Sequence, residues 1–381
     1  MLVIESLHLE NFKAYKDQEF IFSYLTVFCG NNSVGKSTAI QAIGMFLQSN
    51  ILSNDSLKIS GDLVNIGSVD DIVNYENREM DSLSIRVCSP RFDVTWGYGG
   101  DSGKYRDELN NLNELPIITR GKDLSKLRSA FRKGLNFQFL EAERYGPRDN
   151  MPLVNHNYHN NWLGKQGENT IAVLEQLANK RIVYLSGNRR KKDPRRHSTI
   201  NVNNVFNNIE AWMQEISPGY KIVPHVETSA NVAFNSIITP SGQDTKPVNI
   251  GFGYTYALSI VSALILAKAG DLVVIENPEA HLHPRGQSYL GRLIALASEA
   301  KVQVIIETHS DHLLNGIRVI SKIRKSFLPE LFNLYYVSKN NNETEVAHIK
   351  LDNDGRLSEW PKGFFDQQSQ DMYTLMTGSV Q

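Results

Sequence analysis

The stretch FCGNNSVGKSTAI, residues 28–40, contains the pattern GxxxxGK[ST] as Gly30, Gly35, Lys36 and Ser37. An apolar, β-forming run over 17–29 precedes the pattern, and a helical pattern begins at about Lys36. A strand, a loop and a helix in this order form the context in which the pattern cradles phosphates. The sequence therefore predicts a phosphate-binding P-loop over residues 30–38.

The chemistry of this loop predicts its ligands, which are ATP and Mg²⁺. Its glycines let backbone N–H groups close around the phosphates, and the start of the helix adds positive potential. Lys36 is expected to reach the β and γ phosphates, and Ser37 to bind the magnesium ion. The residues expected to hold the nucleotide are Gly30, Asn31, Asn32, Ser33, Val34, Gly35, Lys36, Ser37 and Thr38.

Two further apolar runs end in polar residues. In DLVVIENPEAHLHP, residues 271–284, four apolar residues lead to Glu276, which we expect to be the carboxylate on the magnesium side. In VQVIIETHSDH, residues 302–312, His309 lies just past the end of the run. Carboxyl ends of neighbouring parallel strands meet at one edge of a sheet, so these residues are expected to converge on the P-loop.

The order of apolar patterns predicts an α/β fold with a mixed central sheet. From residue 254 onward, expected helices over 254–268, 286–299 and 311–323 alternate with expected strands over 272–276 and 302–307, which favours a parallel sheet. A closing strand pair is expected over 331–338 and 344–352. Runs over 83–87 and 92–96 predict a hairpin in a small antiparallel subdomain.

Between the two ordered parts the pattern loosens. We expect an inserted, mainly helical lobe over 98–249, with helices at about 169–180 and 204–216. The predicted organisation is a first part of the nucleotide-binding head over 1–97, this insertion, and a second part of the head over 250–381.

Composition narrows the class of protein and the compartment. The net charge of −1 in 381 residues argues against a wholly basic nucleic-acid binder. Only Cys29 and Cys88 are present, so a disulfide framework is not expected. The apolar stretch 257–267 is too short to span a bilayer, which takes about 20 residues. The expectation is a cytoplasmic protein with no membrane association.

The chain resembles ABC-type ATPase heads of the group that contains the structural-maintenance-of-chromosomes (SMC) and overcoming-lysogenization-defect (OLD) ATPases. The likeness is seen in the opening IESLHLENFKAY, residues 4–15, and in the P-loop. It is also seen in the spacing along the sequence, since His309 follows Glu276 by 33 residues. The resemblance implies a P-loop NTPase head, and it gives His309 the role of a switch that senses the γ-phosphate. It also implies a homodimer or higher homo-oligomer.

In such dimers a signature segment of one subunit completes the ATP site of the other. The position in this chain is NIGFGYTY, residues 249–256, which departs from the usual LSGGQ. Gly251 and Gly253 would allow close approach to a phosphate, and Thr255 would supply a hydroxyl. The alternative is that these glycines simply lead into a buried helix.

A second departure concerns catalysis. Asn277 stands where ABC ATPases carry a catalytic glutamate. An amide cannot accept a proton, and loss of a positioned general base costs about 100-fold to 10,000-fold in rate. Slow ATP hydrolysis is therefore expected, with Glu279 as an alternative base. If hydrolysis is negligible, the protein is instead an ATP-sensing scaffold that regulates a separate nuclease.

A narrower likeness is to a bacterial family of AAA ATPases that carry versions of five strings. These are ERYGPR (143–148), NIGFGYTY, ENPEAHLHP (276–284), ETHSDHLLNGIR (307–318) and WPKGFFDQ (360–367). Relatives of this kind occur in phage-defence systems beside separately encoded effectors. The resemblance therefore implies that the chain controls a separate nuclease or other effector protein. A self-contained nuclease is disfavoured because no further acidic domain follows the head.

Three other groups of residues leave alternatives open. His281, His283, His309, Asp311 and His312 also permit a zinc or iron hydrolase site. Arg144 and Arg148 are expected either to reach a phosphate or to brace the two lobes through carboxylates. A basic run is either a solvated loop or a contact for nucleic acid, and it consists of Arg189, Arg190, Lys191, Lys192, Arg195 and Arg196.

Overall fold

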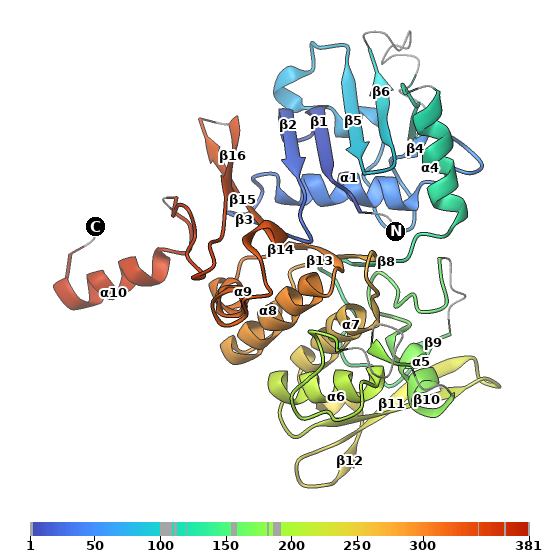
Figure 1. The fold of residues 1–381 in the computed structure, drawn as a ribbon, viewed down its shortest axis with the longest axis vertical. Coiled ribbons are helices and arrows are strands. Elements are labelled where there is room, and N and C mark those ends of the chain that lie inside the picture. Colours follow the sequence, from blue (N-terminus) through green and yellow to red (C-terminus); the bar gives the residue numbers. More distant parts are fainter. Residues whose placement is uncertain are drawn as a thin grey trace.

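The fold is known from a computed structural model. The structure describes residues 3–99, 109, 113–119, 121–153, 158–180, 183–185, 192–341, 343–361 and 363–379. Figure 1 shows an antiparallel sheet at one end, a central sheet below it, and a group of helices beyond the central sheet.

The central sheet has six strands in the order β16-β15-β3-β14-β13-β8. All neighbouring pairs are parallel except β15 and β16, which form an antiparallel hairpin. The predicted mixed α/β sheet is confirmed. Its strands are β3 (Leu25–Gly30), β8 (Phe137–Leu140), β13 (Leu272–Glu276), β14 (Gln303–Glu307), β15 (Phe332–Asn340) and β16 (Glu343–Ile349).

The two faces of this sheet bury different cores because successive side chains of a strand point to opposite faces. On β13, Val273 and Ile275 pack into a core with the helices of one face, and Leu272 and Val274 pack into the core of the other face. The first core contains α7 (Phe252–Leu266), α8 (Pro284–Glu299) and α9 (Asp311–Ile323). The second contains α1 (Lys36–Gln48).

An antiparallel sheet covers α1 from the other side (Figure 1). Its order is β2-β1-β5-β6, so the hairpin predicted over 83–96 is confirmed as β5 and β6. The strands are β1 (Ser6–Phe12), β2 (Tyr15–Ile21), β5 (Leu83–Cys88) and β6 (Asp93–Tyr98). Short elements nearby are β4 (Leu57–Lys58), α2 (Val69–Ile72), a 3-10 helix (Tyr75–Asn77), β7 (Glu114–Leu115) and α4 (Lys122–Arg132).

The segment 98–249 contains both expected helices, but it also contributes strands. The helices are α5 (Thr170–Glu175), which continues as a π-helix to Lys180, and α6 (Val205–Ile216). The strand β8 of the same segment pairs with β13 inside the central sheet. A further sheet comprises β9 (Met151–Pro152), β10 (Lys221–Glu227), β11 (Val232–Ile238) and β12 (Asp244–Thr245). The insertion thus contains strands as well as the expected helices, and one of its strands belongs to the central sheet.

The C-terminal segment follows β16 and ends in α10 (Gln367–Thr377), which extends away from the body in Figure 1. Before that helix, Phe364 is buried against Tyr336 of β15. The segment therefore docks onto the central sheet near the carboxyl end of β3, where the P-loop begins.

Candidate nucleotide site

The loop after β3 requires glycine at two positions. Gly30 has φ +136°, and a Cβ there would lie 1.9 Å from the carbonyl oxygen of Val337. Gly35 has φ +116°, and its Cβ would lie 2.6 Å from Cβ of Ala14. Both values of φ favour glycine, and neither site has room for a side chain. The pattern of glycines is thus fixed by the tight packing of the loop against β15 and the β1–β2 turn.

The start of α1 is arranged as an anion site. Its N-cap residue is Gly35, so no N-cap side chain accepts a hydrogen bond from the backbone N–H groups of the first turn. The hydroxyl of Tyr15 in β2 donates to the Gly35 carbonyl at 2.9 Å, and this hydrogen bond holds the end of the loop in place. Because the N–H groups and the dipole of a helix start attract negative charge, this uncapped turn suits a phosphate.

Lys36 and Ser37 both contact Glu307. The Lys36 ammonium is buried, donates to the carbonyl of Asn31 at 2.5 Å, and lies 3.8 Å from Oε1 of Glu307. The Ser37 hydroxyl donates to Oε2 of Glu307 at 2.8 Å. Burial lowers the pKa of Lys36, and the charge of Glu307 opposes that shift. A bound phosphate would replace the neutral Asn31 carbonyl as the hydrogen-bond partner of the Lys36 ammonium, and it would bring a negative charge to this position.

Two carboxylates end adjacent strands here. Glu276 and Glu307 are register partners at the ends of β13 and β14. Oε2 of Glu276 accepts the Ala142 N–H at 3.1 Å, and burial together with the charge of Glu307 raises the pKa of Glu276 to about 7. With the Ser37 hydroxyl, these carboxylates form a set of hard oxygen donors, which fits Mg²⁺.

Glu307 was not singled out in the sequence, although it is the carboxylate that contacts Ser37. The signal was present, since Glu276 and Glu307 each end an apolar run in a predicted parallel sheet.

Asn277 follows β13 with φ +43°, and its backbone N–H donates to the Glu307 carbonyl at 2.9 Å. Its side-chain Oδ1 is buried and has no hydrogen-bond partner among the described residues. A buried acceptor without a partner is costly, so this oxygen suits a donor such as a bound water. Asn277 also lines the cavity at the P-loop.

The Glu279 carboxylate contacts the loop that follows β14. It accepts the Thr308 hydroxyl at 2.8 Å and the His309 backbone N–H at 2.6 Å. The His309 side chain is exposed and lines the P-loop cavity. Partial removal from water and the charge of Lys36 lower the pKa of His309, which favours the neutral imidazole. Glu279 therefore positions the backbone at His309.

Arg144 braces the loop after β13 through carbonyl oxygens. Its guanidinium is buried and donates to the carbonyls of Glu141 at 2.8 Å, Glu276 at 2.6 Å and Asn277 at 2.7 Å. It also lies 5.0 Å from the ring centroid of Tyr256 in α7. Burial lowers the pKa of Arg144 to about 10. The expected bracing thus runs through main-chain carbonyls and not through carboxylates.

These elements enclose a cavity of about 640 Å³, a size that suits a nucleotide. Asn32, Ser33, Gly35, Lys36, Ser37, Thr38, Asn277 and His309 line it, as expected. Glu276 and Glu279 are not among the lining residues, whereas Glu307 is. The cavity is also lined by residues for which the sequence predicts no role, namely Lys13, Ala14, Gln41, Asp71, Val73, Tyr75 and Arg78.

The signature-like segment lies outside this cavity, at the start of α7. Gly251 and Phe252 are exposed, and a Cβ on Gly251 would meet nothing within 4 Å. A Cβ on Gly253 would lie 2.5 Å from the carbonyl of His281, so close packing explains that glycine. Thr255 is partly buried. The role of Gly251, Gly253 and Thr255 toward a second subunit stays a prediction.

The histidines after β13 and β14 do not gather. His281 packs against Tyr256 and Phe252, and His283 caps α8 by accepting the Arg285 N–H. Within the described part of the chain, no three His, Cys, Asp or Glu side chains are placed to hold a metal. The geometry of these residues therefore gives no support to the metal-hydrolase alternative.

One member of the basic run, Arg195, fits neither the solvated loop nor the contact for nucleic acid. Arg195 is 1% exposed, pairs with Asp193, and donates to the carbonyls of Leu264 and Ala267 at the end of α7. It caps that helix and cannot reach a partner. Lys192 and Arg196 are exposed, while Arg189, Arg190 and Lys191 lie outside the described residues.

A family model described as "AAA domain, putative AbiEii toxin, Type IV TA system" matches residues 25–315, more than half of the chain. The match spans the P-loop, β13, β14 and His309. The chain belongs to this AAA domain family. A second model, described as a protein of unknown function (DUF3696), matches residues 329–375, which include β15, β16 and most of α10.

Two curated proteins are similar to parts of the chain. It is 26% identical over 139 residues to the DNA double-strand break repair Rad50 ATPase of Saccharolobus solfataricus, which covers 34% of this chain and 16% of that protein. It is 20% identical over 353 residues to the OLD nuclease of Thermus scotoductus, which covers 85% of this chain and 62% of that protein. The chain thus spans less than two thirds of either relative.

Two SMC heads are among the solved structures to which the chain is similar. The SMC head domain from Thermotoga maritima matches with a TM-score of 0.44 and 14% identity over 91% of this chain and 98% of that one. The Smc head from Pyrococcus furiosus bound to the C-terminal domain of ScpA matches with a TM-score of 0.48 and 13% identity over 98% and 99%.

Among the described residues, no helix has both the length and the apolar composition needed to span a membrane.

Proposed function

We propose that this AAA-family protein binds Mg²⁺ and ATP in the cavity at the P-loop and hydrolyses ATP slowly to ADP and phosphate. The observation that carries the proposal is the junction of the uncapped start of α1 with Lys36, Ser37 and the carboxylate of Glu307. The helix start and Lys36 attract phosphate, and the Glu307 carboxylate with the Ser37 hydroxyl attracts a divalent cation.

Each residue has a defined task in this proposal. Lys36 would leave the Asn31 carbonyl for the β and γ phosphates, and Ser37, Glu307 and Glu276 would hold the cation. When bound, Mg²⁺ neutralises charge on the phosphate oxygens. His309 would donate a ring N–H to a γ-phosphate oxygen, since Glu279 fixes its backbone at the cavity.

The slow rate is inferred from the side chains that could activate water. Among the residues that line the cavity, Asp71 and Glu307 carry carboxylates. Asp71 accepts hydrogen bonds from Ser68 in a capping box, and Glu307 accepts the Ser37 hydroxyl. Asn277, with its unpartnered Oδ1, can orient a water but cannot take its proton.

Phosphate release by wild type and Asn277→Glu tests this proposal. A carboxylate at position 277 would act as a general base, so turnover is expected to rise by about 100-fold. Glu279→Gln serves as the comparison and should leave the rate unchanged if Glu279 only positions His309. A wild-type turnover near that of typical enzymes, about 10 per second, would contradict slow hydrolysis. So would a fall in rate with Asn277→Glu.

We extend the proposal to assembly and partners. Two copies would close on two ATP molecules, with Gly251, Gly253 and Thr255 of each copy facing the phosphates of the other. The exposure of Gly251 and Phe252, the latter at 54%, supports this arrangement because the start of α7 is accessible. Closure would control a separate effector, such as a nuclease, in cytoplasmic anti-phage defence. Lys192 and Arg196 remain available for nucleic acid.

A further inference from the structure

The part of the cavity wall that comes from the β1–β2 turn and from the segment around the 3-10 helix is given no task in phosphate or cation binding by the proposed function. It contains Lys13 and Ala14 from the β1–β2 turn, and Val73, Tyr75 and Arg78 from the segment around the 3-10 helix. In the proposed function, the γ-phosphate end of a bound nucleotide would lie at Lys36 and His309. The base at the other end of the molecule would then extend toward this wall or into solvent.

Tyr75 is the exposed aromatic side chain of that wall. It is 80% exposed, although an aromatic ring gains much by burial. Its backbone is well anchored, because the Asn74 side chain accepts the Glu76 N–H at 3.1 Å and donates to the Lys13 carbonyl at 2.8 Å. A rigid backbone that presents an exposed ring beside a phosphate site is suited to stacking.

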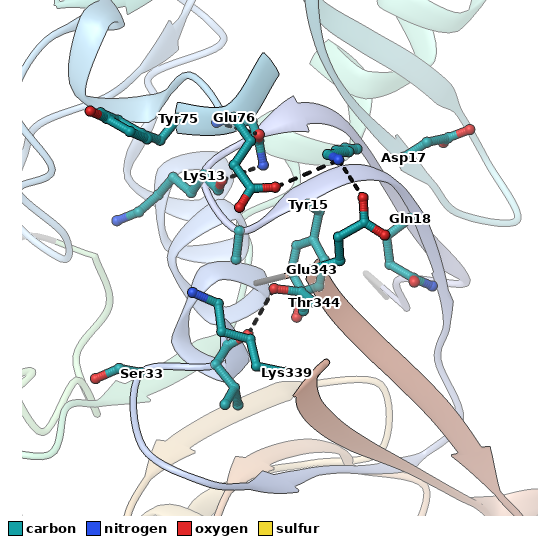
Figure 2. Close-up of a pocket in the computed structure, with 14 residues that line it drawn as sticks. Lys13, Tyr15, Asp17, Gln18, Ser33, Tyr75, Glu76, Lys339, Glu343 and Thr344 are labelled. Carbon is teal, nitrogen blue, oxygen red and sulfur yellow. Dashed lines mark hydrogen bonds and ion pairs between the residues drawn. The ribbon is translucent and has the colours of Figure 1, made fainter. Parts of the chain in front are cut away.

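The surroundings of the ring leave room for a flat ligand. The Arg78 guanidinium lies 5.1 Å from the ring centroid and covers one face by a cation–π contact. Tyr75, Lys13 and Ser33 line the P-loop cavity and also an adjoining cavity of about 260 Å³. Figure 2 looks into that adjoining cavity, with Tyr75 and Lys13 at one side and Ser33 of the P-loop at another.

We propose that Tyr75 is the stacking platform for the base of the nucleotide whose triphosphate lies on residues 30–38. This inference rests on the proposed function and deepens it. Stacking on an aromatic face tolerates every base, because every base has a π-face. Tyr75 therefore contributes affinity for a nucleoside triphosphate over a bare triphosphate, and it does not by itself select adenine.

Calorimetric titration with Mg·ATP and with Mg·tripolyphosphate tests the inference. In Tyr75→Ala the dissociation constant for ATP should rise about 5-fold to 150-fold, which is the range for one lost base–aromatic stack. Tyr75→Phe keeps the ring and should bind ATP within about twofold of wild type. Tripolyphosphate should bind equally to wild type and to both variants, since it has no base.

Phe234→Ala is the matched control, because Phe234 is also an exposed aromatic, 39% exposed, and lies on β11 in a different sheet. It should change neither affinity. The inference is overturned if Tyr75→Ala binds ATP as wild type does, or if it loses tripolyphosphate to the same extent as ATP. If wild type binds neither ligand, the proposed function itself fails, so the two failures are distinguishable.

Discussion

At the residue scale, the site depends on two carboxylates at the ends of neighbouring strands. Glu276 and Glu307 are adjacent because β13 and β14 run parallel and in register. Glu307 is tied to Ser37, whereas Glu276 accepts the N–H of Ala142 from the segment after β8. Two carboxylates this close disfavour a second negative charge unless a cation is bound.

We expect Glu276→Gln to change how stability depends on pH in magnesium-free buffer. The pKa of Glu276 is raised from 4.5 to about 7, so between these values the folded protein holds a proton that the unfolded chain has lost. Wild type should therefore lose about 2 kcal/mol relative to the variant as pH rises from 4.5 to 7. Urea midpoints at pH 5 and pH 8 measure this, and parallel profiles for the two proteins would contradict it.

Sequence reasoning succeeded at residues whose role is set by local geometry. The loop from Gly30 to Thr38 could be predicted because its glycines, lysine and serine have a fixed spacing. Glu307 could not be ranked above Glu276, since only the sheet order places β14 directly beside β3. Tyr75 and Arg78 carry no pattern at all, because they come from an irregular segment that tertiary packing brings to the cavity.

At the element scale, a single buried side chain braces the loop that follows β13. Arg144 bonds three carbonyls there and in the segment after β8, and it lies against Tyr256 of α7. It therefore links the Asn277 backbone, with its left-handed φ, to the helix that begins with the signature-like segment.

Arg144→Leu should destabilise the protein by about 2 to 4 kcal/mol, because it leaves buried carbonyls without donors. Arg148→Leu is a control from the same short string, since Arg148 is exposed and contacts the ring of Tyr145. Chemical denaturation of both variants measures the difference. Equal stability of the two would show that the brace is unimportant.

The elements themselves were predictable where the period of apolar residues was long. The predicted bounds of β13 and α9 agree with the structure, and those of α8 and β14 differ by one or two residues. The strand β8 was missed because FQFL is four residues long and lies within irregular sequence. The segment forms a strand because it pairs with β13, which lies far along the chain, so its own sequence does not predict the pairing.

At the scale of the whole molecule, the two faces of the central sheet have different roles in the proposed function. The face with α1 and the antiparallel sheet carries Tyr75 and Lys13, and the face with α7, α8 and α9 carries the exposed start of α7. In the proposed function, a nucleotide bound at the edge of the sheet would contact the first face, and a second copy of the chain would contact the other.

ATP-dependent dimerisation should therefore be sensitive to the start of α7. Gly251→Arg, in open space, should abolish a dimer that wild type forms with Mg·ATP, and it should leave ATP affinity of the monomer unchanged. Gln243→Arg adds the same charge on the exposed β11–β12 turn and should still dimerise. Light scattering coupled to size-exclusion chromatography gives the masses. A wild type that stays monomeric with ATP, or a Gly251→Arg dimer, would contradict the proposed arrangement.

The central claim is that the P-loop binds and cleaves ATP, and Lys36→Ala tests it most directly. Equilibrium binding of Mg·ATP and release of phosphate are measured for wild type and the variant, with thermal unfolding to verify that the variant folds. The account predicts that wild type binds ATP and releases phosphate slowly, and that Lys36→Ala loses both. Binding and release by a folded Lys36→Ala at the wild-type level would contradict it.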